Sequence, residues 1–222
     1  FTARVFWDDA DDVDGVRPGS VTLKLVAKVG EDLVTDDAVF GADFQWTQEV
    51  RPGVDNTWTT VWESLPRFTT GNEQITYSVV EMNGEQEVSV GGQLNDEYKV
   101  AAYNNFGDGY MTVTNTHTPV TVDITINKIW NDANNQDGIR PDSVTGSLYQ
   151  AEGGSYVKVQ DFVINDTNRT TIEDLPKYVK GSLIQYYITE NVVNGYTVAA
   201  DVAAENTYFA VGDDNKITLT NT

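Results

Sequence analysis

The sequence predicts an all-β protein made of two tandem β-sandwich domains. Its 222 residues suit one large domain or two ordinary ones, and an internal repeat decides in favour of two. Within each copy, short segments rich in Val, Ile, Thr and Tyr alternate apolar with polar residues, and Gly, Asn and Asp separate them. No helical periodicity stands out, so we expect roughly seven strands per domain.

Four pairs of matching segments carry the repeat. The longest pair, VFWDDADDVDGVRPGSVTLKL (5–25) and KIWNDANNQDGIRPDSVTGSL (128–148), aligns without a gap. Three shorter pairs follow in the same order: SLPRF with DLPKY, ITYSVVE with IQYYITE, and MTVTNT with ITLTNT. The offset falls from 123 residues in the first pair to 106 in the last, so the first copy is 17 residues longer, and 13 of these lie between Pro18 and Leu65.

The two copies meet at HTPV (117–120), a short linker in which Pro119 interrupts the strand pattern. We therefore expect a first domain over residues 1–117 and a second over 118–222. A connector this short favours an end-to-end arrangement of the domains.

Composition excludes several classes of partner and site. A net charge of −20 argues against nucleic acid and anionic membrane surfaces as partners. The absence of cysteine excludes disulfides and thiolate metal sites, and a single histidine, His117, excludes a two-histidine metal site. No run is long enough to span a membrane and no signal peptide opens the chain, so we expect a cytosolic protein or a piece of a longer one. We expect no cofactor.

A period of two places three polar residues on the apolar faces of strands in the second copy. Lys128 shares a face with Ile126 and Trp130. In the same way, Glu190 extends the apolar row of IQYYITE, and Asn221 extends that of ITLTNT. Each residue alone fits a side chain that reaches solvent at the rim of a sheet. Together, their types are mutually reactive.

The chemistry of the three residues fits one covalent event. Burial disfavours charge, so it lowers the pKa of a lysine and raises that of a glutamate. A neutral Lys128 amine is a nucleophile, and the side-chain amide carbon of Asn221 is an electrophile. A protonated Glu190 would polarise the amide and relay protons to the departing ammonia. The product is an intramolecular Lys–Asn isopeptide bond, made once and without turnover.

These segments also resemble a known family. NKIWNDANNQDGIRPDSVTGSLY, LPKY, YYITENVVNGY and TLTNT are similar to the B-type (Cna B-like) repeat domains of collagen-adhesin-type surface proteins and pilins of Gram-positive bacteria. The resemblance covers nearly all of residues 120–222 and, more loosely, 1–117. It implies reverse-immunoglobulin-like sandwiches in a stalk that holds a ligand-binding head away from the cell wall. It also implies a self-formed bond between Lys128 and Asn221, assisted by Glu190.

The first copy departs from this pattern at one position. Glu81 and Asn115 keep the register of the acid and the acceptor, but Val5 stands where the second copy has Lys128. Arg4 is adjacent but faces the other way, and a guanidinium stays protonated in proteins. We therefore predict no Lys–Asn bond in the first domain, where Glu81 is protonated or hydrogen-bonded to Asn115.

The acidic loops DDADDVDG and NDANNQDG invite a calcium-binding interpretation. An EF-hand loop needs oxygen ligands at alternate positions and a glycine at the sixth. Counted from Asp9, the glycine comes one residue late and no glutamate closes the loop. We favour an Asx-rich turn between strands, with Asp9, Asp11 and Asp14 as the candidate ligands of the metal-site alternative.

The leading functional hypothesis is a structural stalk module, not an enzyme, of an extracellular, wall-anchored adhesin or pilus protein. Its expected partners are neighbouring domains of the same surface protein and a host extracellular protein or glycan. The alternative is a ligand-binding module that uses the insertion of the first domain. Trp46, Trp58 and Trp62 lie in or near that insertion, either as a platform for sugar or, as we favour, as buried packing.

Overall fold

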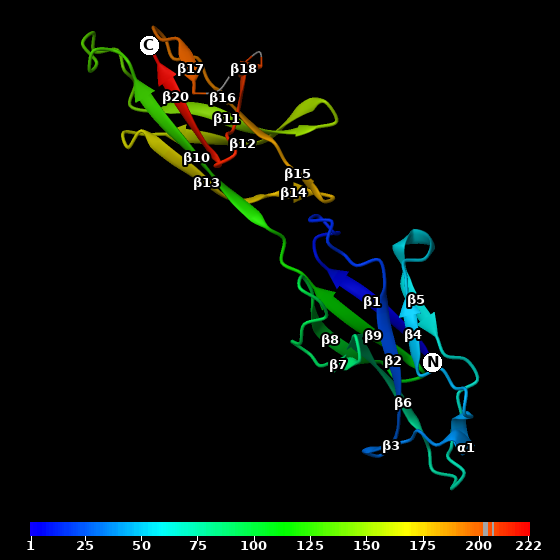
Figure 1. Cartoon of the computed structure of the whole chain (residues 1–222). Helices are drawn as coiled ribbons and strands as arrows, with labels where there is room; N and C mark the ends of the chain where they lie inside the picture. Colours follow the sequence, from blue (N-terminus) through cyan, green and yellow to red (C-terminus); the bar gives the residue numbers. More distant parts are fainter. Residues whose placement is uncertain (202–203, 206) are drawn as a thin grey trace. The chain divides into compact units, whose positions relative to one another are not determined.

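The computed structural model describes residues 1–201, 204–205 and 207–222, and the chain divides into two compact units (Figure 1). Unit 1 comprises Phe1–Asp12 and Val16–Thr118, and unit 2 comprises Val13–Gly15 and Pro119–Thr222. Both units are built from strands packed as β-sandwiches, as the alternating sequence pattern predicts. Within the described residues, no helix is long and apolar enough to cross a membrane.

Unit 1 contains two sheets that pack around one core. Its strands are β1 (Thr2–Asp8), β2 (Val21–Val29), β3 (Asp32–Leu33), β4 (Thr47–Val50), β5 (Trp58–Val61), β6 (Thr76–Asn83), β7 (Gln86–Val88), β8 (Lys99–Asn105) and β9 (Tyr110–Thr116). One sheet has the order β5-β1-β9-β8 and the other β3-β2-β6-β7, with β4 also paired to β2. The extra length of the first copy holds two short helical segments, α1 (Asp37–Phe40) and η1 (Val54–Asn56). β3 and β4 pair with β2 as the single strand β12 pairs with β11 in unit 2, which explains part of the excess over seven strands.

Unit 2 repeats this plan. Its strands are β10 (Thr121–Trp130), β11 (Val144–Glu152), β12 (Ser155–Ile164), β13 (Arg169–Pro176), β14 (Tyr178–Val179), β15 (Ser182–Leu183), β16 (Tyr186–Glu190), β17 (Val198–Ala200), β18 (Ala204–Glu205), β19 (Tyr208–Ala210) and β20 (Lys216–Asn221). One sheet has the order β13-β10-β20-β17 and the other β12-β11-β16-β19-β18, and β14 and β15 form a separate pair.

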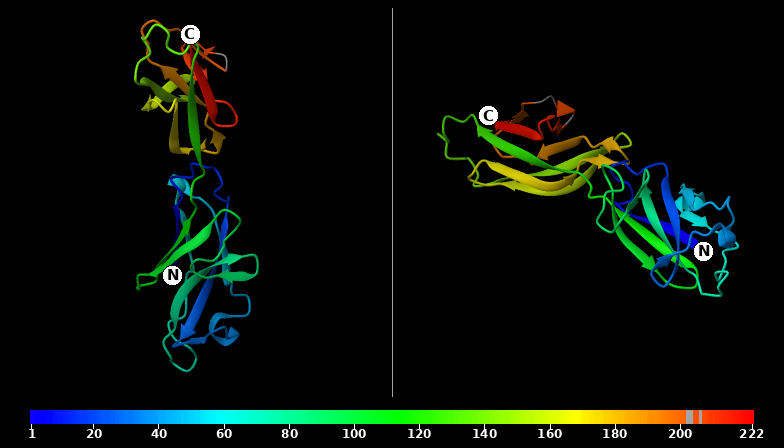
Figure 2. Two further views of the ribbon diagram at one scale, coloured as in Figure 1. Left: turned by 90° about the vertical axis from the view of Figure 1, so that its left-hand side faces the viewer. Right: turned by 60° about the horizontal axis from the view of Figure 1, so that its bottom comes forward.

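The first and last strands of each unit lie side by side and run parallel. In unit 1, β1 pairs with β9 so that Trp7 stands opposite Asn115. In unit 2, β10 pairs with β20 so that Trp130 stands opposite Asn221. Figure 2 shows these two strands, in green and red, side by side. The repeat in the sequence is therefore a repeat in strand register.

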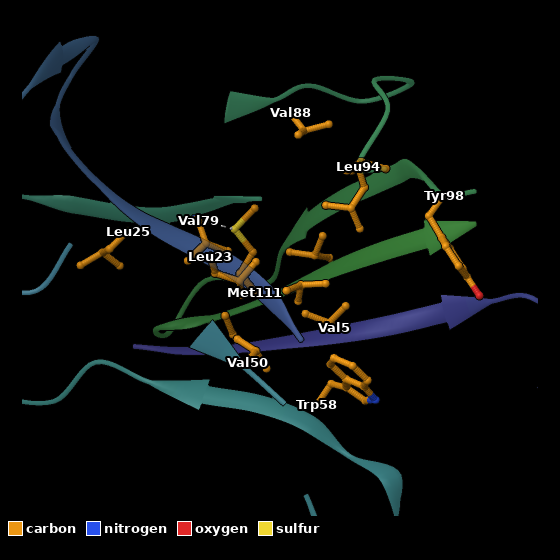
Figure 3. Close-up of a cluster of buried hydrophobic side chains, with 14 of the residues drawn as sticks. Val5, Leu23, Leu25, Val50, Trp58, Val79, Val88, Leu94, Tyr98 and Met111 are labelled. Carbon is orange, nitrogen blue, oxygen red and sulfur yellow. Dashed lines mark hydrogen bonds between the residues drawn. The ribbon is translucent and has the colours of Figure 1, made fainter. Parts of the chain in front are cut away.

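Burial follows the predicted period of two. In β2 the residues alternate between buried and half-buried along almost the whole strand, and the core of unit 1 gathers side chains from both sheets. Figure 3 shows Val5 among them, with Trp58 and Met111. Trp58 and Trp62 are 2% and 3% exposed, which confirms that they serve as packing. Trp46 is half-buried and packs against the rings of Phe40 and Phe44.

Candidate functional site

One carboxyl group joins an amine and an amide inside unit 2. Lys128 Nζ donates a hydrogen bond to Glu190 Oε2 at 2.6 Å, and Asn221 Nδ2 donates to Glu190 Oε1 at 2.8 Å. Lys128 and Asn221 lie on the neighbouring strands β10 and β20, whereas Glu190 ends β16 in the opposite sheet. The structure thus brings together the three residues that the strand pattern singled out.

This group of residues is shielded from solvent. The side chains of Lys128 and Glu190 are each 1% exposed, and Asn221 is fully buried. Burial lowers the pKa of Lys128, although the hydrogen bond to Glu190 opposes that shift. Within the described part of the chain, nothing donates a hydrogen bond to Asn221 Oδ1. A buried acceptor left without a partner is unfavourable.

Glycine opposite Glu190 gives the site its close packing. Gly146 of β11 is the antiparallel partner of Glu190, and the ring of Phe162 covers it. A Cβ at Gly146 would lie 2.2 Å from the carbonyl oxygen of Thr189 and 2.4 Å from the Phe162 ring, so no larger residue fits. In unit 1 the residue opposite Glu81 is Leu23, which is fully buried.

The site borders a cavity and an aromatic side chain. Lys128 Nζ lies 5.2 Å from the centre of the Trp130 ring. A cavity of about 520 Å³ is lined by Glu190 and Asn221 together with Tyr196 and Phe209.

A polar clasp in each unit fixes the loop after the first strand. In unit 2, Asp132 accepts hydrogen bonds from Arg140 Nε at 2.9 Å and from the Tyr196 hydroxyl at 2.9 Å. In unit 1, Asp9 accepts from Arg17 Nε at 2.9 Å and from the Tyr98 hydroxyl at 2.8 Å. The clasp explains why the block from tryptophan to arginine and proline repeats without a gap.

The clasp in unit 1 engages Asp9, one of the three candidate calcium ligands. Burial of Asp9 would raise its pKa, but the hydrogen bonds from Arg17 and Tyr98 outweigh this effect and lower the pKa. Arg17 is therefore already bound to Asp9, the residue that would be the first ligand of the calcium loop. Asp11 is exposed and Asp14 is buried. No group of three or more potential ligands among the described residues is arranged to hold a metal ion.

Unit 1 keeps the acid and the amide without the amine. Asn115 Nδ2 donates to Glu81 Oε1 at 3.0 Å, and both residues are fully buried. Burial raises the pKa of Glu81 to about 7. Val5 is 2% exposed at the position of the lysine. Glu81 and Asn115 are therefore hydrogen-bonded, which is one of the two states expected for Glu81 from the sequence.

Sequence reasoning missed the two clasp tyrosines. Tyr98 and Tyr196 lie 89 and 64 residues beyond the aspartates that they contact. The local signal is one asparagine shortly before each tyrosine, in NDEY and in NGY, which is too short to align by itself.

The chain is similar to one family along nearly its whole length. The family model of the Cna protein B-type domain matches residues 2–116 and again residues 124–222. A collagen adhesin of Staphylococcus aureus is 31% identical over 199 residues, which cover 86% of this chain and 14% of the adhesin. The crystal structure of two B repeat units of the collagen-binding protein of Staphylococcus aureus matches all of this chain and 48% of that one, with a TM-score of 0.70 and 26% identity.

Proposed function

The chain belongs to the family of Cna protein B-type domains, and from that premise we propose that it is a stalk module of a bacterial surface protein. It would lie outside the cell, in an adhesin or pilus protein anchored to the wall through other parts of the protein. Neighbouring domains would be its constant partners. The chain spans 14% of the length of the collagen adhesin to which it is similar.

We further propose that unit 2 forms an isopeptide bond between Lys128 and Asn221. The observation that carries this proposal is the bridging carboxyl group of Glu190, which contacts Lys128 Nζ and Asn221 Nδ2 with different oxygens in a buried site. Burial favours a neutral amine, and proximity turns the attack into an intramolecular step.

The reaction would proceed by acyl transfer at Asn221. Proton transfer to Glu190 leaves a neutral Lys128 amine, which adds to Cγ of Asn221. The bond between Cγ and Nδ2 then breaks. Of the two protons that Lys128 loses, one converts the departing nitrogen into ammonia, and the other stays on Glu190 until ammonia removes it. A single neutral amide replaces the amine of Lys128 and the primary amide of Asn221, which removes the cost of burying a charged lysine.

Intact-protein mass spectrometry tests the bond. We expect the purified chain to weigh one ammonia less than its sequence, and the Lys128→Arg and Glu190→Gln variants to keep the full sequence mass. The Glu81→Gln variant is the matched control and should still lose one ammonia. A full-mass unaltered chain would contradict the bond in unit 2, and a loss of two ammonias would contradict its absence from unit 1.

A further inference from the structure

We propose that unit 2 carries a docking surface for a basic polypeptide segment, formed by four tyrosines on the outer face of the sheet β12-β11-β16-β19. They are Tyr149 of β11, Tyr156 of β12, Tyr187 of β16 and Tyr208 of β19, and we call them the tyrosine cluster. This surface lies apart from the Lys128 site and does not depend on the isopeptide bond.

The rings of the tyrosine cluster form one connected patch. Tyr156 and Tyr208 are stacked, with ring centres 4.0 Å apart and planes 13° from parallel. Tyr149 meets Tyr208 edge to face at 4.9 Å, and Tyr187 meets Tyr156 in the same way at 4.8 Å. Stacked and edge-to-face contacts between aromatic rings are favourable in addition to the burial of their surface, so the rings hold one another in place.

Strand register places the patch on the outside of the sandwich. Tyr149 stands opposite Tyr187, and the neighbouring pair Leu148 and Ile188 points into the core with no exposure. Because side chains alternate between the two faces of a sheet, the tyrosines point away from the core. All four are half-buried, which leaves part of each ring open to a partner.

The fold itself does not require aromatic residues at these positions. In unit 1 the pair equivalent to Tyr149 and Tyr187 is Val26 and Ser78, which stand opposite each other in the same sheet register. The same sandwich is therefore built with a small apolar and a small polar residue on this face. What the second copy adds is an aromatic patch, and tyrosine is the residue type enriched at protein interfaces and at their energetic centres.

Charge identifies the class of partner. The chain carries 34 acidic and only 14 basic side chains, so it attracts cationic partners and repels anionic ones. Lysine and arginine also bind favourably over tyrosine rings. At the margin of the cluster, Asp161 accepts a hydrogen bond from Ser147 and pairs with Lys158 at 2.7 Å, so the excess of negative charge belongs to the chain as a whole and not to this carboxylate. A lysine- or arginine-rich segment satisfies both features.

A binding measurement with matched variants tests the proposal. The probe is a synthetic peptide of alternating arginine and glycine, and its uncharged counterpart carries citrulline for arginine. The Tyr149→Val/Tyr187→Ser variant gives unit 2 the residues that unit 1 has, without changing the charge of the chain. We expect its Kd for the arginine peptide, measured by fluorescence anisotropy, to rise about tenfold, because each 1.4 kcal/mol lost weakens binding tenfold. The citrulline peptide should bind much more weakly than the arginine peptide.

Two controls separate this surface from general charge attraction and from misfolding. Val26→Ala/Ser78→Ala alters the matched face of unit 1 and should leave the Kd unchanged. Tyr187→Phe keeps the ring and should retain most of the binding if the double variant proves too unstable to measure. Equal affinity of the double variant and the unaltered chain would overturn the proposal. Failure to bind the arginine peptide, including the case in which neutral oligosaccharides bind instead, would overturn it as well.

Discussion

Val5 of β1 and Lys128 of β10 occupy the same place in the two units. Each is buried on the first strand, two residues before a tryptophan that stands opposite an asparagine of the last strand. The acid and the amide around them are also equivalent. The two arrangements differ in whether an amine is present at this position, so each unit serves as a control for the other.

Removing the amine should destabilise unit 2. The proposed bond closes the chain between residues 128 and 221, and a disulfide closing a loop of that size contributes roughly 4–5 kcal/mol. We expect Lys128→Met to lower the free energy of unfolding of unit 2 by about 4 kcal/mol, measured by denaturant titration with hydrogen exchange as the readout. Val5→Met, a change at the matched position, should leave unit 2 unaffected. A loss below about 1 kcal/mol would mean that no covalent closure is present.

Adding the amine should activate unit 1. Val5→Lys places an ammonium within the register that Lys128 has, beside a Glu81 carboxyl group that already holds Asn115. We expect this variant to lose two ammonias in total by intact mass. The double variant Val5→Lys/Glu81→Gln should lose only one. If Val5→Lys alone loses only one although it folds, then register and acid are insufficient and the different packing of Leu23 and Gly146 matters.

Unit 1 should become less stable as the pH rises towards neutrality. Burial raises the pKa of Glu81 from 4.5 to about 7, so the folded state binds the proton more tightly than the unfolded state. The protonated Glu81 side chain stabilises the folded state fully below pH 4.5, and this contribution is lost as the pH rises through about 7. The free energy of unfolding that is lost in this way is about 3 kcal/mol.

Tryptophan fluorescence can follow this change, because four of the five tryptophans lie in unit 1. The quantity to compare is the difference in unfolding free energy between the unaltered chain and Glu81→Gln, since other groups titrate alike in both. This difference should shrink by about 3 kcal/mol across the stated pH range. A difference independent of pH would show that Glu81 does not titrate there.

The clasp of unit 1 should matter more than that of unit 2. The Asp9 side chain is fully buried and its partner Arg17 is 10% exposed, whereas Asp132 and Arg140 are 10% and 26% exposed. Removing one member of a buried ion pair leaves an uncompensated charge and costs about 3–5 kcal/mol. We expect Asp9→Ala to lower the melting temperature of unit 1 more than Asp132→Ala lowers that of unit 2, as measured by calorimetry. The reverse order would contradict this burial argument.

Local sequence patterns predicted the strands and the chemically unusual residues within them. Lys128, Glu190 and Asn221 stand out because a period of two is a property of neighbouring residues, and each breaks an apolar row within its own segment. The clasp could not be found this way, because Tyr98 and Asp9 are far apart in the chain and neither breaks a local pattern. The tyrosine cluster was not predicted for a similar reason. Each of four strands contributes one tyrosine, and a single tyrosine on the outer face of a strand is not unusual.

The parallel pairing of β10 with β20 determines how unit 2 would carry a pulling force. Because the two strands run in the same direction, the chain enters at one end of the pair and leaves at the other. Pulling would slide the strands along each other, so that their hydrogen bonds resist together. With Lys128 joined to Asn221, the load would pass from β10 to β20 through one covalent link. Residues 129–220 would then add no length to a stretched stalk, whereas unit 1 could still extend and absorb a sudden load.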